Sequence, residues 1–149
     1  LLPGGHIEIL TADHPTLTYN TIGRHLSRMV NTKVISTKSP WMCDAKAGEI
    51  YTVPISHGEG RFIASPQQVL EFNKTGQIAT QYVDFDGIAS MDSRFNPNQS
   101  VAAIEGIYSP DGRVFGKMAH SERCGAGISK NIYGQLEMPI FTSGVKYFK

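Results

Sequence analysis

The chain has 149 residues, of which 40% are hydrophobic and 18% are charged, and its formal net charge at pH 7 is +1. These values are typical of one globular domain, which at this length buries roughly 70% of the surface of the unfolded chain. Lysines and arginines are scattered along the chain, so nothing in the charge pattern indicates nucleic acid as a partner. No apolar run approaches the roughly 20 residues that span a bilayer, so we expect no membrane partner.

Cysteine usage indicates the compartment. The chain contains two cysteines, Cys43 and Cys124, and neither belongs to a Cys-x-x-Cys pair. Two isolated thiols form no disulfide framework, which favours a cytoplasmic protein with reduced cysteines. The opening Leu-Leu-Pro-Gly-Gly lacks the basic start and the apolar stretch of a signal peptide. It also lacks an initiator methionine, so we expect the chain to be a piece of a longer protein.

The first part of the chain predicts strands separated by turns. Residues 1–18 are rich in turn formers and are typical of a helix end followed by a loop. Residues 24–36 alternate polar with apolar or β-branched side chains, which predicts a strand that ends before Pro40. Residues 49–55 predict a second strand. Because Pro54 cannot donate to a ladder, we expect it at the end of that strand or at a sheet edge.

A capped helix and a hairpin are predicted further on. Ser65 and Pro66 have the chemistry of an N-cap and a first helical position, and Gly76 has that of a helix end. The other elements are predicted at residues 56–60 (turn), 61–64 (extended), 80–85 (strand), 101–108 and 113–118 (hairpin) and 139–148 (short helix). This mixture indicates an α/β protein whose helix count is low for a complete doubly wound sheet.

Four segments in fixed order carry the functional signal. They are residues 54–62 (Pro-Ile-Ser-His-Gly-Glu-Gly-Arg-Phe), 81–84 (Gln-Tyr-Val-Asp), 96–107 (Asn-Pro-Asn-Gln-Ser, then Ile-Glu-Gly-Ile) and 116–123 (Gly-Lys-Met-Ala-His-Ser-Glu-Arg). The series closely resembles the glutaminase domain of the phosphoribosylformylglycinamidine synthase family. The opening segments at residues 13–18 and 22–25 resemble the large, multidomain form of that enzyme.

The resemblance implies a fold. It is the α/β fold of class I glutamine amidotransferases, a flavodoxin-like three-layer sandwich with a mixed sheet. Residues 1–149 would then form a single partial domain, the C-terminal portion of that fold, with its N-terminal part missing. Such a truncation would expose a sheet edge or an apolar face, so we expect self-association as one consequence.

His120 and Glu122 are the candidate catalytic residues. In an extended segment, residues two apart point to the same face, so the two side chains can enter one cleft together. A carboxylate beside an imidazole orients it and stabilises its protonated form. The resemblance implies that they complete a Cys-His-Glu triad in which the imidazole moves the proton. The alternative from the residues alone is a surface histidine beside an ion-pairing Glu-Arg turn.

The nucleophile of that triad is missing from the sequence. In the family it lies in a Gly-x-Cys-x-Gly turn, and the chain contains no such segment. Cys43 lacks the flanking glycines, and Cys124 is too close along the chain to Glu122, so both are interpreted as non-catalytic. By resemblance, the turn should end just before Leu1, and we expect the chain alone to have no glutaminase activity.

Ser56, His57 and Gly58 are the candidate glutamine-binding residues. They resemble the loop that holds the amino-acid end of glutamine, where polar groups surround a zwitterion and glycine permits close backbone approach. His57 could equally be a hydrogen-bonded structural histidine. The family usually has glycine where Gln99 stands, which raises the question whether this loop keeps a positive φ there.

The resemblance implies release of ammonia from glutamine for the ATP-dependent conversion of formylglycinamide ribonucleotide to formylglycinamidine ribonucleotide in purine biosynthesis. The partners would be glutamine and a synthetase domain that holds ATP and Mg²⁺. No cofactor is expected on this chain, since it has neither a glycine-rich phosphate loop nor histidines at metal-ligand spacing. Two alternatives are a non-catalytic docking or regulatory module and another Cys-His hydrolase on a similar fold.

Overall fold

The computed structural model describes residues 13–149. Its elements in chain order are β1 (Thr16–Thr18), β2 (Leu26–Val34), the 3-10 turn η1 (Pro40–Met42), β3 (Ile50–His57), β4 (Arg61–Ile63), α1 (Pro66–Lys74), β5 (Ile78–Tyr82), the 3-10 turn η2 (Val101–Ala103), β6 (Ile104–Tyr108), β7 (Phe115–Lys117) and α2 (Ile140–Tyr147). The helix end expected at the start of the chain lies outside the described residues.

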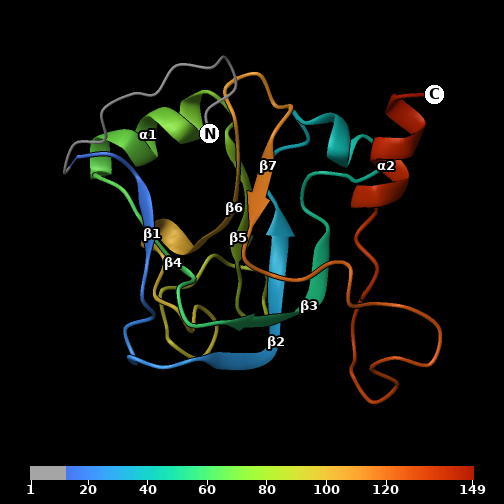
Figure 1. Ribbon diagram of the computed structural model, residues 1–149, viewed down its shortest axis with the longest axis horizontal. Helices are drawn as coiled ribbons and strands as arrows, with labels where there is room; N and C mark the ends of the chain where they lie inside the picture. Colours follow the sequence, from blue (N-terminus) through green and yellow to red (C-terminus); the bar gives the residue numbers. More distant parts are fainter. Residues whose placement is uncertain (1–12) are drawn as a thin grey trace.

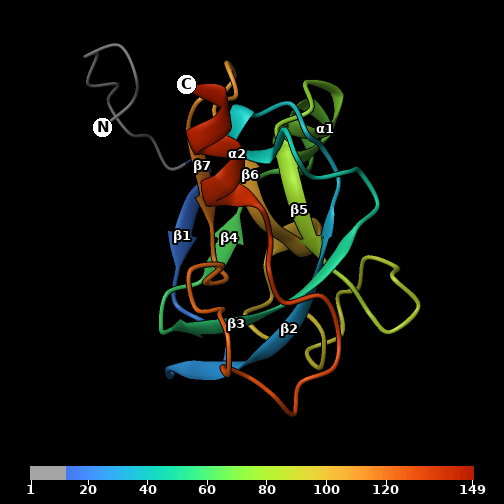
Figure 2. The same ribbon diagram turned by 90° about the vertical axis from the view of Figure 1, so that its right-hand side faces the viewer.

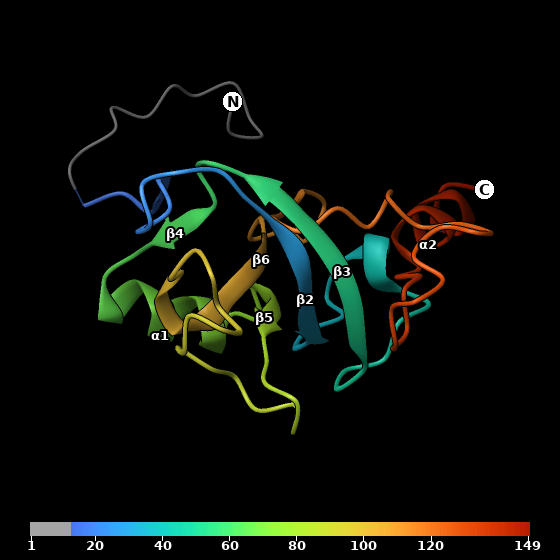
Figure 3. The ribbon, with the colours of Figure 1, turned by 90° about the horizontal axis from the view of Figure 1, so that it is seen from below.

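Five strands form one curled antiparallel sheet in the order β3-β2-β5-β6-β7. β2 and β3 pair from Leu26 opposite His57 to Lys33 opposite Ile50, and Figure 3 shows both strands bending together across the molecule. β3 is an end strand of this sheet, so Pro54 stands at an edge, where a missing N–H can face away from the ladder. The structure therefore confirms the edge position, one of the two expected for this proline.

Helices lie on both faces of the sheet (Figure 1). On one face, Val69 and Phe72 of α1 pack against Ile78 and Ile104 of the central strands. The other face carries the larger apolar cluster, which includes Ile140 of α2, and Figure 2 shows α2 in front of the strands. This helix–sheet–helix layering agrees with the expected three-layer α/β fold.

A second, two-stranded sheet pairs β1 with β4, with Thr16 opposite Ile63 and Thr18 opposite Arg61. The prediction of a loop over residues 13–18 is therefore wrong for this strand. Turn-forming residues surround it, and its partner lies more than 40 positions further along the chain. Local composition could not reveal that pairing because strand propensity depends on the neighbour against which a strand packs.

α1 begins where its capping residues predict. Ser65 accepts a hydrogen bond from the Gln68 N–H (3.2 Å), and the Gln68 side chain accepts one from the Ser65 N–H (2.8 Å), which is a capping box. Thr75 is the C-cap, and Gly76 follows with a φ of 69°. The predicted terminal helix is also confirmed as α2. Among residues 13–149, neither helix has the length and hydropathy of a membrane span.

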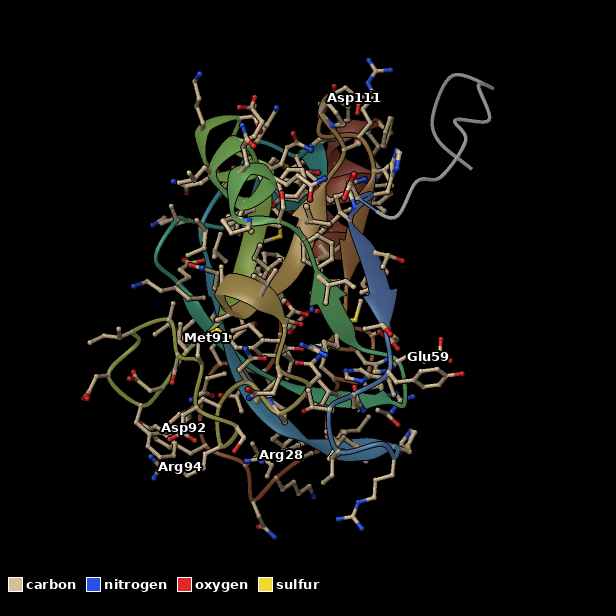
Figure 4. The ribbon with its side chains drawn as sticks, turned by 90° about the vertical axis from the view of Figure 1, so that its left-hand side faces the viewer. Arg28, Glu59, Met91, Asp92, Arg94 and Asp111 are labelled. Atoms are coloured by element: carbon tan, nitrogen blue, oxygen red, sulfur yellow. The ribbon has the colours of Figure 1, made fainter. Side chains whose placement is uncertain are left out.

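The predicted hairpin is confirmed by the antiparallel pairing of β6 with β7. Its turn closes with a hydrogen bond from the Gly112 N–H to the Ser109 carbonyl (2.9 Å), and Gly112 has a φ of 75° that favours glycine. In Figure 4, Asp111 of this turn lies at the opposite end of the molecule from Asp92 and Arg94. The hairpin carries β7 back towards the segment with the candidate catalytic residues.

Candidate active site

The segment that follows β7 brings two of the sequence motifs together. Ala119 forms an antiparallel bridge with Ile55 of β3, and the His120 N–H donates to the Pro54 carbonyl (2.8 Å). β3 and β7 stand at opposite ends of the sheet order, so this contact draws the two ends of the curled sheet together. The backbone of His120 is thereby fixed beside the strand that leads to the turn at residues 56–58.

The His120 and Glu122 side chains contact each other, with 2.6 Å between Nδ1 of His120 and Oε1 of Glu122. Their side chains are 29% and 55% exposed, so the pair is reachable from solvent. Ser121 between them is buried, and its hydroxyl accepts a hydrogen bond from the Lys117 ammonium (3.1 Å). The two side chains meet across a turn, closed by a hydrogen bond from the Arg123 N–H to the His120 carbonyl (3.2 Å), and not along the extended segment that the spacing argument assumed.

Electrostatics favour a charged Glu122 in this pair. Partial burial acts to raise the pKa of the Glu122 carboxyl, but hydrogen bonds from its own backbone N–H and from His120 outweigh burial and leave the pKa lowered. A carboxylate that accepts from Nδ1 fixes the tautomer in which Nδ1 carries the proton. Nε2 is then the nitrogen that can accept a proton from a nucleophile.

His120 and Glu122 line a cavity of about 590 Å³. Its walls are mainly apolar and include Trp41, Met118 and Phe141, whereas Ser56, His57 and Gly58 are not among them. Neither Cys43 nor Cys124 lines this cavity. Among residues 13–149, no three histidine, cysteine, aspartate or glutamate side chains gather as a metal site.

Ser56 and His57 end β3, where a turn was predicted, and together with Gly58 they have contacts of their own outside the cavity lining. The Ser56 hydroxyl lies 3.3 Å from Nε2 of His25, and the Gly58 carbonyl accepts from the Asn20 N–H (2.9 Å). Both ring nitrogens of His57 are buried and have no hydrogen-bond partner among the described residues. Burial lowers the pKa of His57, and the nearby His120 and His25 lower it further.

Residues 1–148 match the family described as the CobB/CobQ-like glutamine amidotransferase domain. The chain belongs to this family. It is 38% identical over 91 residues to the phosphoribosylformylglycinamidine synthase subunit PurQ of Thermomicrobium roseum, a match that covers 61% of this chain and 38% of that relative. The same subunit of Methanosarcina barkeri is 31% identical over 132 residues, which is 88% of this chain and 54% of the relative.

A solved structure agrees with these relatives. The structure of PurLQS from Thermotoga maritima has a TM-score of 0.66 at 25% identity, over 91% of this chain and 54% of that one. The comparisons confirm the family resemblance drawn from the four ordered segments, and they confirm the class I glutamine amidotransferase fold. The chain spans only about half, or less, of the length of these relatives.

The amidotransferase chain braces its 56–60 turn with residues that the sequence did not single out as functional. Asn20 donates to the His57 carbonyl (2.8 Å) and accepts from the Gly60 N–H (3.1 Å). Asn98 donates to the Gly60 carbonyl from the opposite side. An added Cβ at Gly60 would lie 2.0 Å from the His57 ring, so this glycine permits the close approach of ring and backbone.

Gln99 keeps the positive φ that the family's glycine would supply, with a value of 60°. Its side-chain amide donates to the carbonyls of Asn96 (2.8 Å) and Met91 (3.2 Å), and these bonds offset the cost of a left-handed backbone at a residue with a Cβ. Gln99 therefore adopts the backbone conformation that a glycine would favour at this position.

Proposed function

We propose that this chain supplies the general base and its orienting carboxylate to the glutaminase site of a phosphoribosylformylglycinamidine synthase. The observation that carries the proposal is the 2.6 Å contact between His120 and Glu122 at an open, largely apolar cavity. The family is one of glutamine amidotransferases, and the relatives quoted above are named as subunits of that synthase.

The chemistry follows from the tautomer that Glu122 favours. Nε2 of His120 takes the proton of a cysteine thiol, and the thiolate attacks the side-chain amide carbon of glutamine. The tetrahedral intermediate collapses when the same imidazole returns the proton to the departing nitrogen, which leaves as ammonia. Water then hydrolyses the glutamyl thioester and regenerates the thiol. Glu122 stabilises the imidazolium throughout.

The cysteine would come from a Gly-x-Cys-x-Gly segment, which the 149 residues do not contain. Cys43 lies at the end of η1, where its thiol approaches the Ser143 carbonyl of α2 (3.6 Å). The Cys124 thiol is directed to the Ser121 carbonyl (3.2 Å). Both positions support a non-catalytic role for these two thiols.

Ser56, His57 and Gly58 are proposed to hold the amino-acid end of glutamine. The support is their place at the end of β3, where Ser56 and His57 are its last two residues and Gly58 follows, two to four residues beyond the Pro54 carbonyl that binds the His120 N–H. Both ring nitrogens of His57 lack a hydrogen-bond partner among the described residues, which disfavours the alternative of a hydrogen-bonded structural histidine.

Ammonia would pass to a synthetase partner that binds ATP, Mg²⁺ and the ribonucleotide. The solved PurLQS structure supports a multi-part assembly for the relatives. β7 ends the sheet on one side, so we also propose that the chain self-associates or captures a partner strand along this edge.

Both cysteines are free, which supports the cytoplasm as the compartment.

An assay of ammonia release from glutamine tests whether this chain holds the general base but lacks the nucleophile. We expect none from the 149-residue chain, because it contains no nucleophile turn. Turnover that survives both Cys43→Ala and Cys124→Ala would refute the triad, and turnover abolished by one of them would assign the nucleophile to that cysteine. Calorimetry with glutamine distinguishes a residual substrate site from a non-catalytic module, which would release no heat.

A further inference from the structure

A carboxylate with no role in the proposed chemistry lies beneath the site. Glu105 of β6 is 2% exposed, and its side chain is fully buried. One carboxylate oxygen, Oε1, accepts from the backbone N–H groups of Met118 (3.1 Å) and Ala119 (2.7 Å). The other, Oε2, accepts from the Thr80 hydroxyl of β5 (2.5 Å). Glu105 thus ties the backbone just before His120 to the centre of the sheet.

Lys117 holds the same segment from the other side. Its ammonium lies 3.3 Å from Oε1 of Glu105 and is 11% exposed at the side chain. It donates to the Ala119 carbonyl (2.9 Å) and to the Ser121 hydroxyl (3.1 Å). Two of the three ammonium donors are used in these hydrogen bonds, and the Glu105 carboxylate balances the charge, although Lys117 lines the cavity that His120 lines.

Together these contacts fix the backbone on both sides of the imidazole. The N–H and the carbonyl of Ala119 are both bound by the ion pair, Ser121 is bound by Lys117, and the His120 N–H is bound by Pro54. A stability role alone is the weaker account, because a buried ion pair can often be replaced by apolar residues without loss of stability. The contacts of this pair converge instead on the segment that carries His120.

We propose that Glu105 and Lys117 are positioning residues for His120, which hold its imidazole at the distance and angle that proton transfer needs. The inference rests on the proposed glutaminase function. It assigns neither residue a contact with glutamine. Misplacement of a catalytic group by even about 1 Å can cost on the order of a hundredfold in rate. Loss of the contacts that hold the backbone beside His120 should therefore lower kcat.

The test uses the full enzyme that contains this chain together with its nucleophile segment, with three variants: Lys117→Met, Glu105→Gln and the double variant. Each single variant leaves one buried charge unpaired and lowers the melting temperature. The double variant removes both charges, so its melting temperature recovers. Kinetics are measured below the melting transition of every variant.

Positioning predicts that the kcat for glutamine hydrolysis stays about 10- to 100-fold below the wild-type value in the double variant. The KM for glutamine should stay within about twofold, because neither residue touches the substrate. Hydrogen exchange should accelerate at residues 118–122. As a matched control, Asp92→Asn removes the carboxylate of the exposed Asp92–Arg94 pair, and its kcat should be unchanged.

Two results would overturn the inference: a double variant with wild-type kcat, or one with raised KM and unchanged kcat. A different result would show that the proposed glutaminase function itself is wrong. If His120→Asn leaves glutamine hydrolysis intact, the glutaminase assignment is wrong. If His120→Asn abolishes hydrolysis while the double variant is fully active, only the positioning role is wrong.

Discussion

At the scale of single residues, the Glu122 carboxylate fixes the tautomer of His120 through the 2.6 Å contact with Nδ1. We expect Glu122→Gln to lower kcat for glutamine hydrolysis about 10²- to 10⁴-fold in the full enzyme, because an amide can present its NH₂ group and favour the wrong tautomer. Steady-state kinetics check this. Arg123→Gln is the control, since Arg123 is exposed and its Nε lies 3.9 Å from Glu122, and an equal loss in both variants would contradict the assignment.

The sequence could predict that His120 and Glu122 lie close together because they are two positions apart, but the structure joins them across a turn and not along an extended segment. It could not predict Glu105 or Asn20 as supporting residues. Glu105 contacts Lys117 and Thr80, 12 and 25 positions away, and Asn20 contacts His57 and Gly60, 37 and 40 positions away, and only the folded chain brings these residues together. Glutamine binding by Ser56, His57 and Gly58 stays a prediction.

At the scale of elements, α1 owes its first turn to the capping box of Ser65 and Gln68. Ser65→Ala should lower the free energy of unfolding by about 1 kcal/mol, because the Gln68 N–H loses its acceptor. Denaturant titration measures the change. Ser65→Asp keeps an acceptor at the helix N-terminus and should stay near the wild-type stability. A similar loss in both variants would show that the cap is not the cause.

The docking of α2 depends on a glycine in its middle. A Cβ at Gly144 would lie 2.5 Å from the ring of Trp41, which belongs to η1. Gly144→Ala should therefore lower the free energy of unfolding by about 1–3 kcal/mol, although alanine raises helix propensity by about 1 kcal/mol. Thermal unfolding checks the sign, and Val145→Ala at the exposed neighbour should be nearly neutral. A stabilised Gly144→Ala variant would contradict this packing.

Helices and turns that depend on residues close in sequence were predicted well. Strands whose bounds depend on pairing with distant segments were not. Caps and turn residues located α1 and the β6–β7 hairpin. The strand expected at residues 80–85 instead runs from Ile78 to Tyr82, because its bounds follow its pairing with β2 and β6. β1 was missed for the same reason, since its pairing with β4 has no local signature.

At the scale of the whole molecule, three tyrosines are buried on the strands of the sheet. Burial raises the pKa of Tyr51, Tyr82 and Tyr108 above the ordinary value of about 10. Above pH 10 the unfolded chain therefore loses these protons while the folded chain keeps them. Each tyrosine then removes about 1.4 kcal/mol of the free energy of unfolding per pH unit, so stability is retained below pH 10 and lost above it.

Alkaline titration measures this loss. The tyrosinate absorbance of these three buried tyrosines, half of the six in the chain, should change together with the circular dichroism in one cooperative transition above pH 10. Tyr108→Phe should reduce the slope of stability against pH by about 1.4 kcal/mol per unit, since one titrating group is gone. Gradual ionisation of the buried tyrosines near pH 10 in a protein that stays folded would contradict the account.

The whole-molecule arrangement also explains why the site could be only partly predicted. The bridge between Ala119 and Ile55 joins the two ends of the sheet order, and no local pattern indicates it. It is this bridge that places the backbone of His120 against Pro54. The order of the motifs along the chain predicted a glutaminase site. The curl of the sheet brings the segment of His120 next to β3, which the motifs alone did not predict.

The proposed function depends on proton transfer by His120 during glutamine hydrolysis. The most direct measurement compares glutamine-dependent with ammonia-dependent synthesis in the full enzyme carrying His120→Asn. We expect the glutamine-dependent rate to fall about 10²- to 10⁴-fold, while free ammonia supports the wild-type rate. A glutamine-dependent rate that survives the substitution, or an ammonia-dependent rate that falls with it, would contradict the account.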